Sequence, residues 1–198
     1  MIDLILSRKN PVIEKGNKDR KILFAAYFDK EINFEEIDAV IIQTSDLNDL
    51  NSKIAKISAR KKIVIVEGNT DLINRKALEN KNVFMLLSPE KIRKQDSINF
   101  KNSGLIQVLC EIARKNSKII GINLAEILNE GGEMKPDIEK AKITGRIMQN
   151  VKLCRKYKCK IILLSCSEKP IPLEIIKNTA FLLGFSTSQI KEMGKFIV

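Results

Sequence analysis

Histidine is absent from this chain of 198 residues, and so is tryptophan. Most acid–base sites, serine or cysteine triads and transition-metal sites depend on histidine, so its absence removes those classes of chemistry. Carboxylate sites for Mg²⁺ need no histidine, but no cluster of acids is evident at the ends of the apolar runs. The sequence therefore indicates a protein without the usual catalytic side chains.

Long apolar runs are also lacking. No uncharged apolar stretch approaches the roughly 20 residues of a membrane span, and the short apolar start, Met1–Leu6, has no basic region or cleavage site. A strand is therefore the better interpretation of that start than a signal peptide. None of the four cysteines is part of a CxxC pair, and each lies in an apolar or helical run. We expect reduced, mostly buried thiols in a cytoplasmic protein that contacts no membrane.

Basic residues outnumber acidic ones, with 35 Lys and Arg against 24 Asp and Glu, which gives a net charge of +11. A surplus of this size points to a polyanionic partner such as RNA, DNA or acidic lipid, with a lysine-rich solvated surface as the alternative. The surplus is concentrated in residues 140–160, which hold eight bases and no acid.

The basic stretch has the periodicity of a helix with two faces. Its apolar positions recur at about 3.6-residue spacing and predict a buried face made of Ile143, Ile147, Val151 and Cys154. A separate stripe is basic and consists of Lys142, Arg146, Lys152 and Lys156. A phosphate backbone would be attracted to that stripe, although a solvated lysine face has the same pattern.

Short β-rich apolar runs alternate with helical segments along the whole chain. The predicted strands are Met1–Leu6, Lys21–Tyr27, Asp38–Thr44, Lys62–Glu67, Val83–Leu87, Lys118–Leu124 and Lys160–Cys166. The predicted helices are about Asp46–Arg60, Asp71–Asn80, Ser103–Asn116, Pro136–Lys158, Leu173–Leu183 and Ser186–Gly194, with N-cap types at Asp46, Thr70 and Ser186. This alternation, without a GxGxxG signal, predicts an α/β fold: a single small (β/α) TIM-like barrel over residues 1–198.

The segment Ser88–Leu105 connects a predicted strand to a predicted helix and is rich in Arg, Lys, Asp, Ser and Asn. It carries many functional groups but no catalytic set, which favours binding by a surface loop. Arg93 and Lys94 follow a strand, where barrels place functional residues, so we expect them to contact phosphate or a partner protein. A pair of solvated charges is the alternative.

Other polar residues of this segment are expected to brace it. Asp96 and Ser97 suit loop bracing, Asn102 or Ser103 suits the N-cap of the following helix, and Gly104 permits a close turn.

Glu67 ends a strand at the same predicted face of the barrel. It could bind Mg²⁺, but we favour an ion pair with Arg75 or Arg93. Phe100 stands in the polar segment and could stack on a base, anchor a partner protein or fold under its own loop.

Several stretches, in this order, resemble the archaeal ribonuclease P protein component 3 family. They are Val64–Gly68, Leu72–Ala77, Leu87–Glu90 with Arg93, Lys94, Asp96 and Ser97, then Ser103–Leu105, Val108–Leu109, Ile120–Asn123, Val151–Tyr157 and Leu182–Phe185. Each piece is weak alone, and their order and spacing carry the resemblance. The departures are extra residues near Ile98–Asn102 and Gln107 at a position where histidine is common.

This resemblance implies a barrel related to the polymerase-and-histidinol-phosphatase barrels, whose histidine-rich metal cluster this chain cannot reproduce. It implies a protein subunit of ribonuclease P, in which the RNA uses Mg²⁺ to remove the 5′ leader from precursor tRNA. The chain itself would then have no catalytic residue and would bind no cofactor. The implied partners are the ribonuclease P RNA, protein component 2 in a heterotetramer, other ribonuclease P protein subunits and precursor tRNA.

The residues expected to bind RNA or a partner are all basic: Arg93, Lys94, Lys101, Arg146, Lys152, Arg155 and Lys156. The residues expected to brace the loop are Glu67, Asp96, Ser97, Asn102 and Gly104. Two other functions fit the same composition. One is a barrel phosphoesterase with a carboxylate metal site, and the other is a general RNA-binding module.

Overall fold

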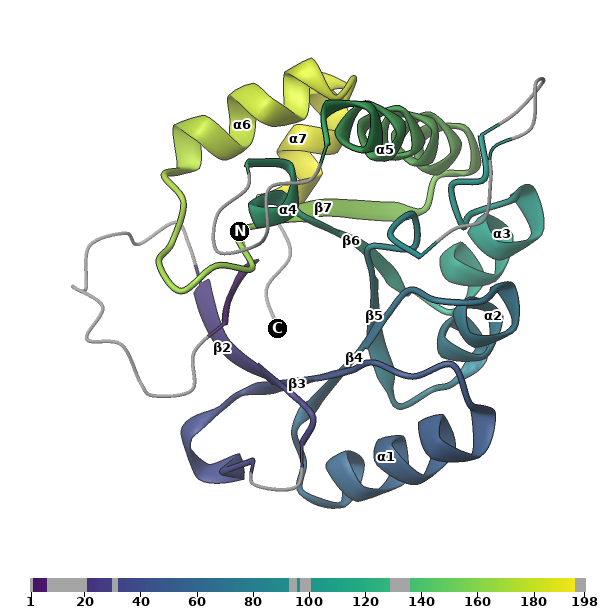
Figure 1. The fold of residues 1–198 in the computed structure, drawn as a ribbon, viewed down its shortest axis with the longest axis vertical. Helices are drawn as coiled ribbons and strands as arrows, with labels where there is room; N and C mark the ends of the chain where they lie inside the picture. Colours follow the sequence, from purple (N-terminus) through teal and green to yellow (C-terminus); the bar gives the residue numbers. More distant parts are fainter. Residues whose placement is uncertain are drawn as a thin grey trace.

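Seven parallel strands form one sheet that curves into a barrel (Figure 1). The computed structural model describes residues 2–6, 21–29, 32–92, 96, 101–128 and 136–194. The strands follow one another in chain order: β1 (Ile2–Leu6), β2 (Lys21–Tyr27), β3 (Ala39–Ile42), β4 (Ile63–Glu67), β5 (Val83–Leu87), β6 (Ile119–Asn123) and β7 (Lys160–Leu164). The predicted α/β class and TIM-like barrel are thus confirmed, with seven predicted strands found as seven strands.

The longer helices lie on the outside of this ring, and the short α4 lies at its edge beside β7 (Figure 1). The helices are α1 (Leu47–Ala59), α2 (Asp71–Glu79), α3 (Gln107–Lys115), α4 (Leu124–Leu128), α5 (Asp137–Tyr157), α6 (Leu173–Leu182) and α7 (Thr187–Met193), with a 3₁₀ turn η1 (Phe34–Glu36). The side chains of Asp46, Thr70 and Ser186 cap α1, α2 and α7, as their positions predict. The short elements η1 and α4 are too brief for a periodic pattern to reveal.

The start of α3 corrects one prediction. The helix begins at Gln107 rather than at Ser103, and Ile106 occupies the N-cap position without a side-chain capping bond. The prediction that Asn102 or Ser103 caps this helix is therefore wrong. The Ser103 hydroxyl instead donates to the carbonyl of Leu105 and accepts from Gln149 on α5, and the Asn102 N–H donates to Asp96.

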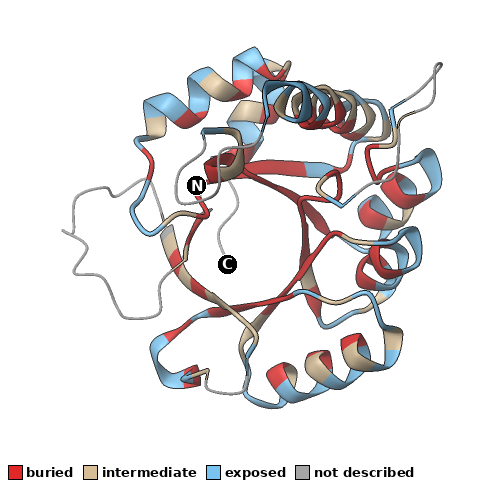
Figure 2. Ribbon diagram, in the orientation of Figure 1, coloured by how far each residue is buried: buried red, intermediate tan, exposed pale blue. Residues whose placement is uncertain are grey.

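The core has the two layers typical of a parallel barrel. Buried residues line the strands and the inward faces of the helices (Figure 2). β3 is buried at each of its positions and β4 at four of five, which explains why these strands are apolar throughout rather than alternating. Among the described residues, no helix is both long enough and apolar enough to cross a membrane.

The barrel is nearly closed where β1 meets the residues that follow β7. The backbone N–H of Leu6 donates to the carbonyl of Ser167 at 3.0 Å, and the N–H of Cys166 donates to the carbonyl of Leu4 at 2.8 Å. The fully buried carboxylate of Asp3 accepts from the Ser165 N–H at 2.6 Å and from its hydroxyl at 2.7 Å. A buried carboxylate is costly unless it is bonded in this way, so Asp3 and Ser165 depend on each other.

We expect Asp3→Ala to lower the free energy of unfolding by about 3 kcal/mol, because two charge-assisted hydrogen bonds are lost and the Ser165 N–H is left buried without its partner. Urea unfolding followed by circular dichroism measures this change. Asp137→Ala is the matched control, since the Asp137 side chain is fully exposed at the start of α5; it should cost less than about 1 kcal/mol. Equal effects of the two substitutions would contradict a role for Asp3 in closing the barrel.

Candidate functional site

The carboxyl ends of the strands form the mouth of the barrel, where enzymes of this fold place their active sites. Glu67 is the last residue of β4, Lys91 follows β5, and Glu126 lies in α4 directly after β6. The Lys91 Nζ lies 2.8 Å from Glu67 Oε1 and 2.7 Å from Glu126 Oε1. The Tyr27 hydroxyl, at the end of β2, donates to the same oxygen of Glu67 at 3.2 Å. One ammonium thus joins two carboxylates across the mouth.

The electrostatics of the mouth hold this arrangement in one charge state. Burial disfavours the Lys91 ammonium, but the charge of Glu67 and the hydrogen bonds to both carboxylates outweigh burial and raise the pKa of Lys91 above its usual value. Burial, reinforced by the negative charge of Glu67, also raises the pKa of Tyr27. Lys91 therefore stays charged and Tyr27 stays neutral throughout the physiological pH range.

These contacts correct one of the two predicted partners of Glu67, which is Arg75. Arg75 pairs with Glu79 inside α2 at 2.7 Å, and Arg93 lies outside the described residues. The partner that the structure shows is Lys91, the residue that follows the motif Leu87–Glu90. Because its ammonium already lies between Glu67 and Glu126, these two carboxylates do not form an open site for a divalent cation.

Lys91→Met should lower the free energy of unfolding by about 3 kcal/mol, because Glu67, which is only 1% exposed, loses its countercharge. Denaturant unfolding at neutral pH measures this loss. The double variant Lys91→Met/Glu67→Gln should recover part of it, since the charge without a partner is then removed as well. A single variant as stable as the wild type would show that the ion pair contributes nothing to the mouth.

The polar segment Ser88–Leu105 begins in close contact with the end of β4. A Cβ atom on Gly68 would overlap the backbone of Pro89, so only glycine permits this approach. Ser88 adopts a left-handed backbone conformation (φ 47°), and its hydroxyl accepts from the Asn123 N–H at the end of β6 at 3.3 Å. The ends of β4, β5 and β6 therefore fix the position at which the segment leaves the barrel.

The far end of the segment is bound to α5 and α2. Asn150, fully buried on α5, donates from Nδ2 to the carboxylate of Glu90 at 3.2 Å and to the carbonyl of Ser103 at 2.9 Å. Asn74 on α2 donates to the carbonyl of Gly104 at 3.2 Å, and Gly104 has a positive φ of 77°. One amide on α5 thus ties the beginning of the segment to its end.

Asp96 makes another contact between the segment and α5. Its carboxylate accepts from Arg146 Nε at 2.8 Å and from the Asn102 N–H at 2.8 Å. Arg146 is only 7% exposed, so the prediction that it belongs to an exposed basic stripe is wrong, and its predicted contact with RNA or a partner stays a prediction. Its guanidinium is directed to the segment, because the row of α5 that carries Arg146 and Asn150 faces the loop rather than solvent.

Burial alone would raise the pKa of Asp96, but the hydrogen bonds from Arg146 and the Asn102 backbone lower it. A lowered folded-state pKa stabilises the fold above the unfolded-state value of about 3.9 and loses that contribution as the pH falls through the folded-state value. We expect Arg146→Met to cost about 2 kcal/mol at pH 7. The cost should shrink at acidic pH below the folded-state pKa of Asp96, where wild-type Asp96 also becomes protonated.

Urea unfolding of the wild type and the variant at both pH values tests this expectation. Arg75→Met provides the control, since its pair with Glu79 is exposed and should contribute less than about 1 kcal/mol. A cost for Arg146→Met that is the same at both pH values would contradict the proposed pairing with Asp96.

The remaining basic residues form an exposed patch, which we call the α5 basic face and define as Lys101, Lys142, Lys152, Arg155 and Lys156. Lys101 reaches this helix from the segment, since its side chain lies directly against Gly145. Gln149, one turn further along α5, donates to the carbonyl of Lys101 at 2.8 Å. Arg93, Lys94, Ser97 and Phe100 lie outside the described residues, so their predicted roles stay predictions.

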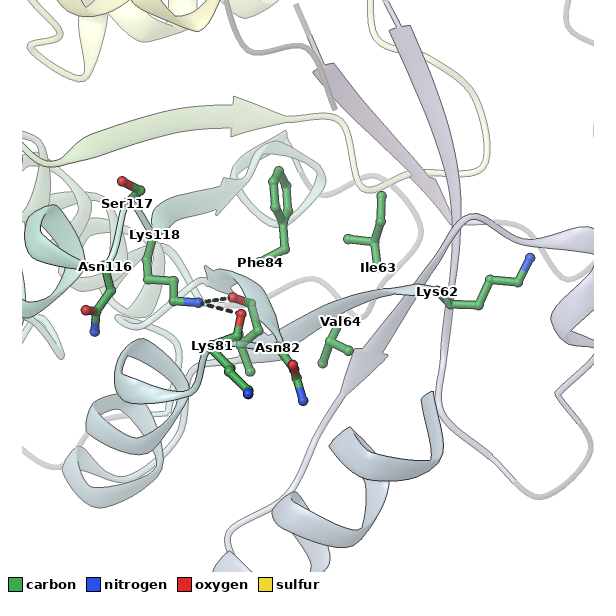
Figure 3. A pocket seen from close by; sticks show the side chains of 10 residues that line it. Lys62, Ile63, Val64, Lys81, Asn82, Phe84, Asn116, Ser117 and Lys118 are labelled. Atoms are coloured by element: carbon green, nitrogen blue, oxygen red, sulfur yellow. Dashed lines mark hydrogen bonds between the residues drawn. The ribbon is translucent and has the colours of Figure 1, made fainter. Parts of the chain in front are cut away.

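One hollow of about 290 Å³ lies at the opposite end of the barrel, where β4, β5 and β6 begin (Figure 3). Lys118, which is buried there, donates to the backbone carbonyls of Asn80, Lys81 and Val83. Its ammonium is thus occupied in joining the loop before β5 to β6. We interpret this hollow as a structural feature, because barrels carry function at the other end.

The fold and the site together define a TIM-like barrel protein with an ion-paired mouth, a polar segment bound to α5 and an exposed basic face. No family model matches the chain. Curated sequences do: it is 29% identical over 147 residues to ribonuclease P protein component 3 of Methanosarcina acetivorans, covering 72% of this chain and 56% of the relative. It is 27% identical over 154 residues to the same component of Methanocaldococcus jannaschii, covering 78% and 60%.

The chain is thus related in sequence to archaeal ribonuclease P protein component 3, as the ordered motifs predict. It spans a little over half the length of the curated relatives it matches. Among solved structures, a chain in a complex described as archaeal ribonuclease P with mature tRNA aligns with a TM-score of 0.73 at 23% identity, over 98% of this chain and 87% of that one. An amidohydrolase aligns with a TM-score of 0.52 at 10% identity, over 96% and 53%. These two structural likenesses show the barrel fold alone.

Three residues that make contacts at the site, Lys91, Glu126 and Asn150, are not predicted from the sequence. Each of them gains its role from a partner far away in the chain. The position of Lys91 just after a barrel strand is the one signal that could have identified it.

Proposed function

We propose that this chain is a protein subunit of ribonuclease P that assists the catalytic RNA in removing the 5′ leader from precursor tRNA. The observation that carries the proposal is the sequence relationship to component 3 over 72% of the chain. The shared barrel fold supports it. In this proposal the chain belongs to an endoribonuclease complex but supplies no catalytic group, and Mg²⁺ acts through the RNA.

The α5 basic face supports a contact with RNA. Its five cations are exposed and come from one helix and one bound segment, and no acidic residue interrupts residues 140–160. Phosphate oxygens are attracted to such a face, and the strength of the contact depends on salt. The proposed partners are the ribonuclease P RNA, protein component 2 in a heterotetramer, the other protein subunits and precursor tRNA.

The barrel mouth argues against the alternative of a phosphoesterase with a carboxylate metal site. Glu67 and Glu126 both bind the Lys91 ammonium, and Tyr27 donates to Glu67 as well. A divalent ion between these two carboxylates would meet the charge of Lys91 at the same place. The RNA and the proteins that co-purify with the chain distinguish a ribonuclease P subunit from a general RNA-binding module.

Reconstitution of the holoenzyme from its RNA and its protein subunits, with and without this chain, tests the proposal. We expect omission of the chain to reduce leader cleavage at low Mg²⁺ concentration, and the isolated chain to cleave nothing. Cleavage that is unchanged without the chain would overturn the assignment, and turnover of precursor tRNA by the chain alone would favour the phosphoesterase.

The contribution of the α5 basic face is tested with Lys152→Ala/Lys156→Ala. Each lost phosphate contact should reduce the slope of log affinity against log salt by about 0.7 to 0.9, so the double variant should bind RNA more weakly and with a shallower slope. Lys56→Ala/Arg60→Ala is the matched control. It removes the same charge from two positions that are also four residues apart, at the end of α1. Each of the two pairs includes a cation that lies over an aromatic ring, so the loss of such a contact is matched as well. Equal losses of RNA affinity in the two double variants would indicate that binding depends on net charge rather than on the α5 basic face.

A further inference from the structure

Three of the four cysteines converge at one point in the core. Cys110 lies on α3, Cys154 on the last turns of α5, and Cys159 directly before β7. Their sulfur atoms all lie within 4.8 Å of one another. Cys110 and Cys154 are 0% exposed and Cys159 is 6% exposed. The fourth cysteine, Cys166, is also buried but lies at the other end of β7 and is not part of this cluster.

The end of α5 brings two of these thiols together. Lys158 terminates the helix in a left-handed conformation with φ 55°, which turns the chain back on itself. The N–H of Cys159 then donates to the carbonyl of Cys154 at 3.0 Å. Cys110 is brought to them by α3, which packs against α5. Three separate elements therefore direct sulfur atoms to the same place.

Packing alone does not require this convergence, since a buried cysteine serves the core as a small apolar residue wherever it lies, as Cys166 does. The distances between the three sulfur atoms are close to those between the ligands of one metal ion. A metal–sulfur bond is about 2.3 Å long, so three sulfur ligands in one plane around an ion lie about 4.0 Å apart. The three sulfur atoms, which lie within 4.8 Å of one another, would therefore have to move together by less than about 1 Å to bind one ion.

We propose that Cys110, Cys154 and Cys159 form a binding site for one Cu(I) ion. Each thiol releases its proton to solvent as its sulfur binds the ion, and no electron is transferred because copper enters and stays as Cu(I). The three thiolates and the ion carry a net charge of −2. Arg155, Lys156, Lys158 and Lys160 are basic residues close to Cys154 and Cys159 in the chain. The copper site does not rest on the proposed function.

The ligand set favours Cu(I) over Zn²⁺. Thiolates are soft ligands that select Cu(I) as well as Zn²⁺, but structural zinc sites are almost always four-coordinate. The chain has no histidine, and in the part of the chain that the structure describes no fourth cysteine or carboxylate joins the cluster. Burial of all three residues leaves little access for water as a fourth ligand. Three sulfur ligands without a fourth donor suit a low-coordinate Cu(I).

The test is anaerobic titration of the reduced full-length chain with Cu(I), in competition with a colorimetric Cu(I) chelator and with Zn²⁺ in a parallel titration. We expect one Cu(I) per chain and a melting temperature that rises on binding. Cys154→Ala and Cys159→Ala should each weaken binding about 100-fold or more, since loss of a ligand costs at least as much as loss of an outer-shell partner. Cys166→Ala, a matched loss of a buried thiol outside the cluster, should bind like the wild type.

Melting curves recorded without metal keep the test decisive, because they show whether each variant folds. Cys159 is the most accessible of the three residues, so Cys159→Ala leaves the smallest void if Cys154→Ala does not fold. The proposal is overturned if the wild type fails to compete with the chelator, or if the folded Cys159→Ala binds Cu(I) as tightly as Cys166→Ala. One equivalent of Zn²⁺ bound in the absence of Cu(I) binding would overturn the copper assignment.

Discussion

The contact between β1 and β7 is the constraint on which the rest of this molecule depends. A parallel sheet of seven strands can stay open or close, and closure here relies on two backbone hydrogen bonds and on the buried carboxylate of Asp3, which binds Ser165. Closure brings the carboxyl ends of all seven strands to one mouth. Residues distant in the chain, such as Tyr27, Lys91 and Glu126, then meet in one connected set of contacts with Glu67.

Positive charge has two distinct uses in this barrel. Lys91, Lys118 and Arg146 are buried or half-buried, and each is satisfied inside the protein, by two carboxylates, by three backbone carbonyls and by Asp96 respectively. These cations hold the mouth, the base of the barrel and the polar segment in place. The cations of the α5 basic face are exposed, and all of them except Lys101 lie on the same helix that carries Arg146. Cations that are paired inside the protein therefore hold the elements on which the exposed cations lie.

Much of the fold could be predicted from the sequence, because hydrophobic periodicity reports burial. The continuous apolar runs located all seven strands, and the spacing of Ile143, Ile147 and Val151 identified the buried face of α5. The same periodicity assigns Arg146 to the exposed stripe, because it gives the direction of a side chain around the helix axis but not the residue that this side chain contacts. It also began α3 at Ser103, because polar residues before a helix resemble caps whether or not tertiary contacts use them elsewhere.

The sequence by itself determined the class of the fold, the basic character of α5 and the absence of histidine chemistry, since these properties depend on composition and local order. Only the tertiary structure decided which charges face solvent and which face each other. Lys91 joins Glu67 to Glu126, Arg146 holds Asp96, and three cysteines meet from three elements. The physical reason is that charge pairing and metal ligation act over a few ångströms in space, and residues far apart in the chain come that close only when the barrel closes.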